Sequence, residues 1–522
     1  MAALQAALLL LFGLALAALA PSEQATLSRR LPLVHDHIAF SRSLRSLRYV
    51  PPPPKVTRAV PAKVDTFHLD QVLDHFNPVD KTTWKQRYFA RTDLYEEGGP
   101  VFIYIGGEGA ESTDTLDDGV LFMTYLAENF KAKLYDLEHR YYGGSHPTPD
   151  LSSANLQYLS ADQALADLAY FIETLIEKGE IEKDQKVAVF GGSYPGNLAA
   201  WARIKYPHLV HAAVSSSAPV YAEADFIEYM QVVAKSLDKV AGTFCGENIK
   251  KATDRIVQLL KTTDGYEQVK ETFQVGTDLK DKLDLDAFFE TLSNPFAGAV
   301  QYNRDVPYSP YSIKYICSSM AGDNLTGDQA MEQLSALVLG SSKGTGQMFD
   351  WSYQSSVTSY QSTQYQGASK HRAAVRQWLY QTCTEFGYYQ TFSGDGTPFP
   401  KAYNDLAYDY QLCKDIFGDA YDKAVVDGGV RRSNIVFGER HPDVTNVIFV
   451  NGDIDPWHAL GILEDVSPQA PAAFVDGGSH CADMNYPDPD SDSASIIAVH
   501  DKVHKFLRSA LYEVPSGGPA DG

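Results

Sequence analysis

The sequence predicts an α/β fold: a mostly parallel sheet whose two halves are separated by a large helical insertion. Short apolar runs alternate with helical segments from about residue 64 to 221, and this rhythm stops between 222 and 425, where helical stretches dominate. Apolar runs then return after residue 426. Apolar strands separated by helices are typical of a parallel sheet covered on both faces. One sheet interrupted by an insertion is therefore the simplest organisation.

The first half of the sheet is predicted from four short apolar runs. These strands lie at residues 101–105, 133–137, 187–190 and 212–216. Helices are expected between them, because apolar residues recur there at helical spacing. They cover residues 121–129, 162–178 and a segment that follows Ser193 and stops near Pro207.

The second half of the sheet is predicted from two further apolar runs, 446–450 and 472–475, and a closing helix at 496–511. The insertion between the halves contains loops and an aromatic-rich stretch at 351–365. The predicted domains are thus a core in two parts, 63–221 and 426–512, and a helical cap at 222–425.

The two ends of the chain are predicted to lie outside these domains. Residues 1–20 are nearly all apolar and end in small residues, which is typical of a signal peptide, with an uncleaved anchor as the alternative. Residues 21–62 contain the run Pro51–Pro54 and suggest a pro-segment or tether, and 513–522 a disordered tail. No other segment has about 18 uninterrupted apolar residues, so no membrane contact is expected after signal removal. We expect a secreted or a lysosomal or vacuolar protein.

Charge and cysteine usage exclude several functions. A formal charge of −22 and a pI near 5.0 argue against nucleic acid as a partner, because phosphate contacts need clustered Lys and Arg. Five cysteines in an exported chain suggest two disulfides and one free thiol. No C-x-x-C or H-E-x-x-H occurs, so neither a metal site nor a cofactor is expected. Asn324, in an N-x-T tripeptide, is a candidate glycosylation site.

A candidate nucleophile stands between a predicted strand and a predicted helix. Ser193 follows the apolar run 187–190, and a sharp turn there would lift its hydroxyl clear of the sheet. Such a turn needs small neighbours: Gly191 satisfies this at minus two, whereas Pro195 stands at plus two and Gly196 comes next. Pro is acceptable early in a helix, so the turn remains possible.

A second serine matches the G-x-S-x-G pattern letter for letter. Ser342 lies in Gly340–Gly344, but a flexible segment follows it instead of a helix. Because the pattern requires a strand, a turn and a helix, we interpret Ser342 as a loop residue.

Candidate partners of Ser193 follow it in the order acid, then base. Asp453 and Asp455 come after the strand 446–450, and His480 lies on a Gly-rich loop after the strand 472–475. The order Ser, Asp, His is that of an α/β-hydrolase fold, and the residues alone leave both acids open. The backbone N–H of Tyr194, with that of Gly107 or Glu108 in the loop 106–109, would then hold an oxyanion. The alternative for that loop is a plain tight turn.

Four motifs in this order resemble the prolyl exopeptidase family of serine peptidases, and its thymus-specific serine protease branch in particular. Along the chain they are EHRYYG at 138–143, FGGSYPG at 190–196, NGDIDPW at 451–457 and GSHCADM at 478–484. The resemblance implies Asp455 as the acid and His480 as the base. It also implies the disulfides Cys383–Cys413 and Cys245–Cys317, which leave Cys481 as a free thiol.

The resemblance implies a serine exopeptidase that acts on peptides, with a pocket for the residue before the scissile bond (P1). Asn197 stands where an apolar Met would help to line a proline pocket, so a preference for proline is left open. Trp457 is interpreted either as a wall of this pocket or as a core residue, and Tyr388 as a further substrate-binding candidate. A lipase or esterase with the same triad, and a non-catalytic binding protein, are the alternatives. The sequence does not specify which peptide end is trimmed, and it is compatible with a homodimer.

Overall fold

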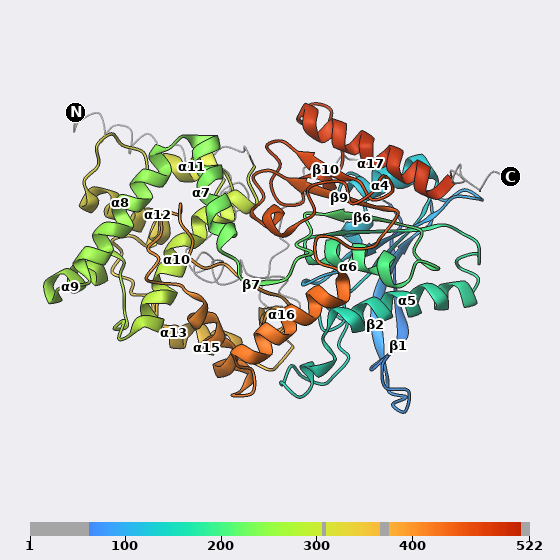
Figure 1. Cartoon of the computed structure of the whole chain (residues 1–522), viewed down its shortest axis with the longest axis horizontal. Helices are drawn as coiled ribbons and strands as arrows, with labels where there is room; N and C mark the ends of the chain where they lie inside the picture. Colours follow the sequence, from blue (N-terminus) through green and yellow to red (C-terminus); the bar gives the residue numbers. More distant parts are fainter. Residues whose placement is uncertain (1–61, 305–308, 366–374, 513–522) are drawn as a thin grey trace, which may run out of the picture.

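The computed structural model describes residues 62–304, 309–365 and 375–512, arranged as a core and a helical cap (Figure 1). The predicted signal peptide, most of the tether and the predicted tail lie outside this part. An eight-stranded sheet with the order β1-β2-β4-β3-β5-β6-β9-β10 forms the centre of the core. Only β2 runs antiparallel to its neighbours. This confirms the predicted α/β-hydrolase fold.

The six predicted strands form at the predicted positions, with shifts of one or two residues at some ends. They are β3 (Val101–Ile105), β4 (Lys133–Leu137), β5 (Val187–Gly192), β6 (Ala212–Ser216), β9 (Val447–Gly452) and β10 (Ala472–Val475). The parallel pairing β3–β5–β6–β9–β10 directs the carboxyl ends of these strands to one edge. Segments far apart in sequence therefore meet at that edge.

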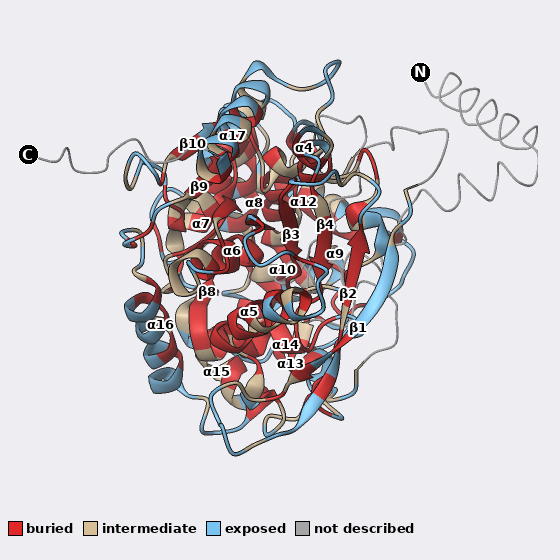
Figure 2. Ribbon diagram, turned by 90° about the vertical axis from the view of Figure 1, so that its right-hand side faces the viewer, coloured by how far each residue is buried: buried red, intermediate tan, exposed pale blue. Residues whose placement is uncertain are grey.

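Two strands of the eight-stranded sheet were not predicted from the sequence. β1 (Asp65–Val72) and β2 (Thr83–Arg91) form an antiparallel pair at one edge of the sheet. Five of the eight side chains of β1 are exposed, as the pale edge in Figure 2 shows. An edge strand with a polar surface lacks the continuous apolar run that marked the central strands.

Helices cover both faces of the sheet, and strand alternation assigns each residue to a face. In β3, Ile103 belongs to the cluster containing α5 (Ala161–Glu177) and α6 (Tyr194–Lys205), whereas Phe102 belongs to the cluster on the opposite face. That opposite face is covered by α4 (Phe122–Phe130) and α17 (Ala494–Tyr512). The alternation is the expected consequence of the two-residue period of a strand.

The chain between β6 and β9 forms the cap, which lies beside the sheet in Figure 1. Its helices are α7 (Ile227–Ala241), α8 (Phe244–Leu259), α9 (Thr263–Thr272), α10 (Lys282–Gln301), α11 (Ile313–Ser318), α12 (Gly327–Leu339), α13 (Tyr353–Tyr360), α14 (Val375–Gln381), a π-turn (Thr382–Phe386), α15 (Leu406–Phe417) and α16 (Lys423–Phe437). The exact boundaries of the predicted domains stay a prediction.

Two disulfides connect parts of the cap, as the resemblance implied. Cys245 of α8 bonds Cys317 of α11, and Cys383 of the π-turn bonds Cys413 of α15. Cys481 is the free thiol. Within the described part of the chain, no helix is long and apolar enough to span a bilayer.

Candidate active site

Ser193 lies at a sharp turn between β5 and α6, with φ 63° and ψ −134°. A non-glycine residue in this backbone region is strained, and such strain gathers at functional sites. A Cβ atom at position 191 would lie 2.0 Å from the carbonyl oxygen of Pro195, and one at position 196 would lie 2.7 Å from that of Ser216. Glycines at minus two and plus three therefore permit the turn, and Pro195 at plus two is accommodated in the first turn of α6.

Asp455 and His480 are in direct contact at the carboxyl edge of the sheet. His480 Nδ1 lies 2.9 Å from Asp455 Oδ2, and the two residues are 6% and 0% exposed. The backbone N–H of Trp457 donates to the other oxygen of Asp455 at 3.0 Å and fixes the carboxylate. Asp453 points elsewhere, because it pairs with Lys239 of the cap and accepts the N–H of Gly477. Of the two candidate acids, Asp455 is the one that contacts the imidazole.

The loop carrying His480 is held by the cap and lies against the turn of Ser193. The backbone N–H of His480 donates to the carbonyl of Gln301, the last residue of α10, at 2.9 Å. On the other side, Cys481 N–H donates to Ser217 Oγ at 2.9 Å. A Cβ atom at position 192 would lie 2.9 Å from Cys481 Sγ, so the residue before the nucleophile packs against the residue after the imidazole.

Ser193 is half-buried, and its hydroxyl makes no hydrogen bond to another described residue. The imidazole of His480 is hydrogen-bonded through Nδ1, which leaves Nε2 as the atom available to a hydroxyl. Contacts between a nucleophile and its base are often loose in structures without substrate. The arrangement is compatible with transfer of the Ser193 proton to His480.

Buried ionisable groups near the site have perturbed pKa values. Burial disfavours the imidazolium of His480, but the carboxylate of Asp455 and the thiol of Cys481 outweigh it and hold the pKa of His480 well above its usual value. Burial raises the pKa of Asp483 to about 6, against the hydrogen bond from Ser216 Oγ. Burial also raises the pKa of Glu385, in the π-turn, to about 7, against the backbone N–H of Ala161.

The raised pKa of Glu385 predicts a contribution to stability that is present in acid and lost near neutral pH. Because the pKa of Glu385 is higher in the folded than in the unfolded chain, its contribution is complete below about pH 4.5 and is lost as the pH rises toward 7. The loss is on the order of 3 kcal/mol. Thermal unfolding at pH 5 and pH 7.5 should show a smaller decrease of Tm for Glu385→Gln than for the wild type. Glu177→Gln, which alters an exposed acid of α5, should leave the wild-type decrease unchanged; an equal decrease in all three would contradict the prediction.

The loop at 106–109, the predicted source of a second oxyanion donor, follows β3, which pairs with β5. Gly106 packs against β4, because a Cβ atom there would lie 2.6 Å from the carbonyl oxygen of Leu137. Its N–H donates to that carbonyl at 2.8 Å, whereas the N–H of Gly107 has no acceptor among the described residues. The N–H of Tyr194, at the first position of α6, likewise has no acceptor within the helix. Glu108, in the same loop, is also buried.

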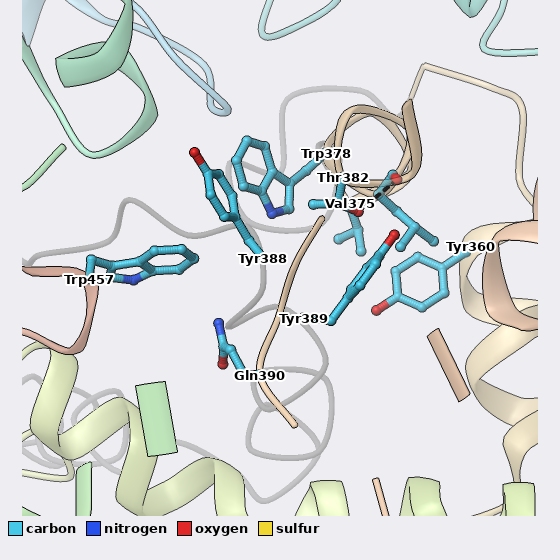
Figure 3. Close-up of a pocket in the computed structure, with 9 residues that line it drawn as sticks. Tyr360, Val375, Trp378, Thr382, Tyr388, Tyr389, Gln390 and Trp457 are labelled. Atoms are coloured by element: carbon cyan, nitrogen blue, oxygen red, sulfur yellow. Dashed lines mark hydrogen bonds between the residues drawn. The ribbon is translucent and has the colours of Figure 1, made fainter. Parts of the chain in front are cut away.

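An aromatic pocket lies beside Trp457, in the loop that follows β9 (Figure 3). Trp457 lines one side, and its ring lies 6.2 Å from that of His480. Trp378 is a further lining residue, and its ring lies 5.7 Å from that of Tyr194. No charged side chain lines this hollow. The remaining lining residues are Tyr360, Val375, Leu379, Thr382, Tyr388, Tyr389 and Gln390.

Other predicted residues lie in different surroundings. Asn197 is fully buried below the pocket, where its amide donates to the carbonyl of Pro219 and to the hydroxyl of Tyr388, so it supports Tyr388 without lining the pocket. Ser342 lies in a short turn of the cap and bonds Gln347. Asn324 is exposed on a turn. No cluster of potential metal ligands occurs within residues 62–304, 309–365 and 375–512.

Several residues of the site were missed by the sequence analysis. They are Gln301, Tyr302, Trp378, Gln381 and Asp483. The ring of Tyr302 lies 6.2 Å from that of His480. Four of them come from the cap, where helical periodicity predicts which side chains are buried but not which strand edge they face. A polar residue inside an apolar helix face, such as Gln381, was the only feature of the sequence that could have indicated these site residues.

The fold and these motifs define the protein as an α/β-hydrolase with a capped site. The family model described as "Serine carboxypeptidase S28" matches residues 71–503, and the chain belongs to this family of serine peptidases. The thymus-specific serine protease of Mus musculus is 36% identical over 458 residues, which cover 85% of this chain and 87% of the mouse protein. Lysosomal Pro-X carboxypeptidase of Homo sapiens is 29% identical over 466 residues, covering 86% and 89%.

Among solved structures, the proline iminopeptidase of Mycobacterium smegmatis aligns over its whole length with 85% of this chain, at 11% identity and a TM-score of 0.36, too low a similarity to argue from. The family membership confirms the resemblance predicted from the four motifs.

Proposed function

We propose that the protein is a serine exopeptidase in which Ser193, His480 and Asp455 form the catalytic triad. The observation that carries the proposal is the buried Asp455–His480 hydrogen bond of 2.9 Å, on loops that follow two neighbouring strands. Ser193 follows a third strand of the same parallel edge, in the strained conformation of a nucleophile turn.

In the proposed mechanism, Ser193 Oγ attacks the scissile carbonyl while His480 Nε2 accepts its proton. His480 then donates this proton to the leaving amine, and water hydrolyses the acyl-enzyme by the same route. Asp455 orients the imidazole and stabilises its cation, in keeping with the raised pKa of His480. The N–H groups of Tyr194 and Gly107 would hold the oxyanion, with Glu108 N–H as the alternative donor in that loop. Each such donor is worth about 3–4 kcal/mol.

The pocket supports a P1 residue with an apolar side chain. Its walls are mostly aromatic and uncharged, and rings such as Trp457 and Tyr388 would pack against a proline ring or a similar apolar group. The cap covers this pocket and contacts the loop of His480, which favours chain ends over the middle of a folded protein. Peptides are therefore the proposed substrates. A lysosomal or secreted location is proposed with them, supported by the name of the lysosomal relative.

Labelling with a fluorophosphonate, followed by peptide mapping, tests the nucleophile. We expect the label on Ser193 and none on the Ser193→Ala variant, which should also lose peptidase activity. Labelling elsewhere, or turnover by Ser193→Ala near that of the wild type, would overturn the proposal. A failure of the folded protein to react at all would favour a non-catalytic binding protein.

Product analysis tests the substrate class. Mass spectrometry of a mixed peptide pool should show the loss of residues from one chain end, and the end affected distinguishes a carboxypeptidase from a dipeptidyl peptidase. Turnover of a proline-containing dipeptide amide should exceed that of a long-chain ester. The reverse preference would assign the same triad to a lipase or esterase.

A further inference from the structure

A chain of buried hydrogen bonds connects the cap to the residue that follows the nucleophile. The hydroxyl of Tyr194 lies 3.0 Å from His139 Nε2 and 3.0 Å from Gln381 Nε2. The oxygen of the Gln381 amide accepts the hydroxyl of Tyr142 at 2.7 Å. All four residues are at most 4% exposed. We call this chain the Tyr194 network.

The network joins three separate parts of the fold. His139 and Tyr142 belong to the EHRYYG motif after β4, Tyr194 begins α6, and Gln381 is the last residue of α14 in the cap. Gln381 is thus separated from Tyr194 by 187 positions in the sequence, yet their side chains bond directly. The spacing of residues within a local motif could not have predicted this contact.

The direction of each bond can be assigned. His139 Nδ1 lies 2.7 Å from the carbonyl oxygen of Arg140, and a carbonyl can only accept, so Nδ1 carries the proton. In the neutral imidazole Nε2 is then an acceptor, and the hydroxyl of Tyr194 donates to it. That hydroxyl in turn accepts the N–H of Gln381, whose own oxygen accepts from Tyr142. The hydroxyl of Tyr194 therefore donates once and accepts once, away from water.

This network bears on catalysis because Tyr194 provides a proposed oxyanion donor. The backbone of Ser193 is strained, so the orientation of the next peptide group has to be fixed by surrounding contacts. The ring of Tyr194 packs against Trp378 and Phe386, which restrict its position, and the two hydrogen bonds fix its far end. A residue held at both ends keeps its N–H directed at one point.

We propose that Gln381 is a positioning residue through which the cap sets the oxyanion hole: it holds the Tyr194 hydroxyl, and thereby the Tyr194 N–H, in place. This rests on the proposed function, since it assigns a role to the Tyr194 N–H in hydrolysis. Gln381 is proposed to act on the oxyanion hole through Tyr194; its side chain also contacts Tyr142 and lies 3.4 Å from Glu385 Oε2.

Two substitutions test the proposal, each with the catalytic triad intact. Tyr194→Phe removes only the hydroxyl, and Gln381→Leu removes its cap partner. We expect each to lower kcat about tenfold, equivalent to roughly 1.4 kcal/mol, with KM within about twofold of the wild type. The double variant should lose no more than the worse single variant, because both act through one bond. Rates are normalised to active sites titrated with the fluorophosphonate.

The matched control is Tyr141→Phe. Tyr141 is a fully buried neighbour in the same motif, but its hydroxyl donates to the carbonyl of Asn155 and lies outside the Tyr194 network. All three single variants should lower Tm, whereas Tyr141→Phe should keep kcat within about twofold. A purely structural role would give the same Tm losses with no difference in kcat.

A second readout reports the oxyanion itself. A peptidyl trifluoromethyl ketone forms a bond between Ser193 Oγ and its carbonyl carbon, the carbonyl oxygen becomes the oxyanion, and the proton passes to His480. Its inhibition constant should rise in Tyr194→Phe by the same factor as kcat/KM falls. An unchanged inhibition constant and an unchanged kcat in both variants would overturn the inference about Gln381. The proposed function would still stand if Ser193→Ala abolished activity. If the wild type neither hydrolyses peptides nor reacts with the fluorophosphonate, the proposed function fails and the inference fails with it.

Discussion

Replacing Asp455 with Asn is expected to lower kcat about 10⁴-fold while leaving the fold intact. The carboxylate accepts the Nδ1 proton of His480 at 2.9 Å, both side chains being buried, and Asn can present its amide to Nδ1 instead. The imidazole would then be held in the tautomer whose Nε2 carries a proton and cannot accept one from Ser193. Steady-state turnover of a peptide amide, with active sites counted by fluorophosphonate labelling, measures the effect.

Asp453→Asn is the matched control for that experiment. It changes an acid two residues away, which pairs with Lys239 and does not contact His480. A partly exposed ion pair is worth about 1 kcal/mol or less, so a small decrease of Tm and nearly normal turnover are expected. If Asp453→Asn were the variant that abolished turnover, the assignment of the acid would be wrong.

Replacing Gly191 with Ala is expected to prevent the nucleophile turn from forming. The added Cβ atom would lie 2.0 Å from the carbonyl oxygen of Pro195 and 2.4 Å from its carbonyl carbon, and these backbone atoms cannot rotate away. The start of α6 would have to move, which should cost at least about 4 kcal/mol and displace Ser193. Thermal unfolding and the rate of fluorophosphonate labelling should both fall sharply.

Gly428→Ala is the comparison, because the position of Gly428 has space for a Cβ atom. Gly428 lies on the exposed side of α16, and a Cβ atom there would meet nothing within 4 Å. Ala is favoured over Gly inside a helix by about 0.5–1 kcal/mol, so this variant should be slightly stabilised and fully reactive. Equal stability of Gly191→Ala and Gly428→Ala would show that the turn does not depend on a glycine at minus two.

The central strands were predictable because their signal is local. Runs such as 101–105 and 187–190 are buried on both faces, so every residue is apolar and the pattern stands out from one short segment. β1 carries its polar side chains outward at the edge of the sheet, so it lacks that signal and was missed. The cap could be predicted as helical but not placed, because periodicity does not specify which partner a helix face meets.

The candidate site was predictable in part for the same reason. The position of Ser193 follows from a strand, a turn and a helix that are neighbours in sequence. The choice between Asp453 and Asp455 does not follow from such local signals, since both acids come after the same strand and differ only in the direction of their side chains. The sequence pattern around the two acids was compatible with either one, and the family resemblance favoured Asp455. The contact of Asp455 with His480 agrees with that choice.

The sequence by itself determined the positions of six core strands, the helical nature of the cap, and the positions of a serine, two acids and a histidine along the chain. These depend on apolar periodicity and on turn residues, which act over a few neighbouring positions. Only the tertiary structure decided that Asn197 supports Tyr388, that Gln301 holds the loop of His480, and that Gln381 reaches Tyr194. Those contacts join side chains that are far apart in sequence, and their formation depends on how the cap packs on the sheet.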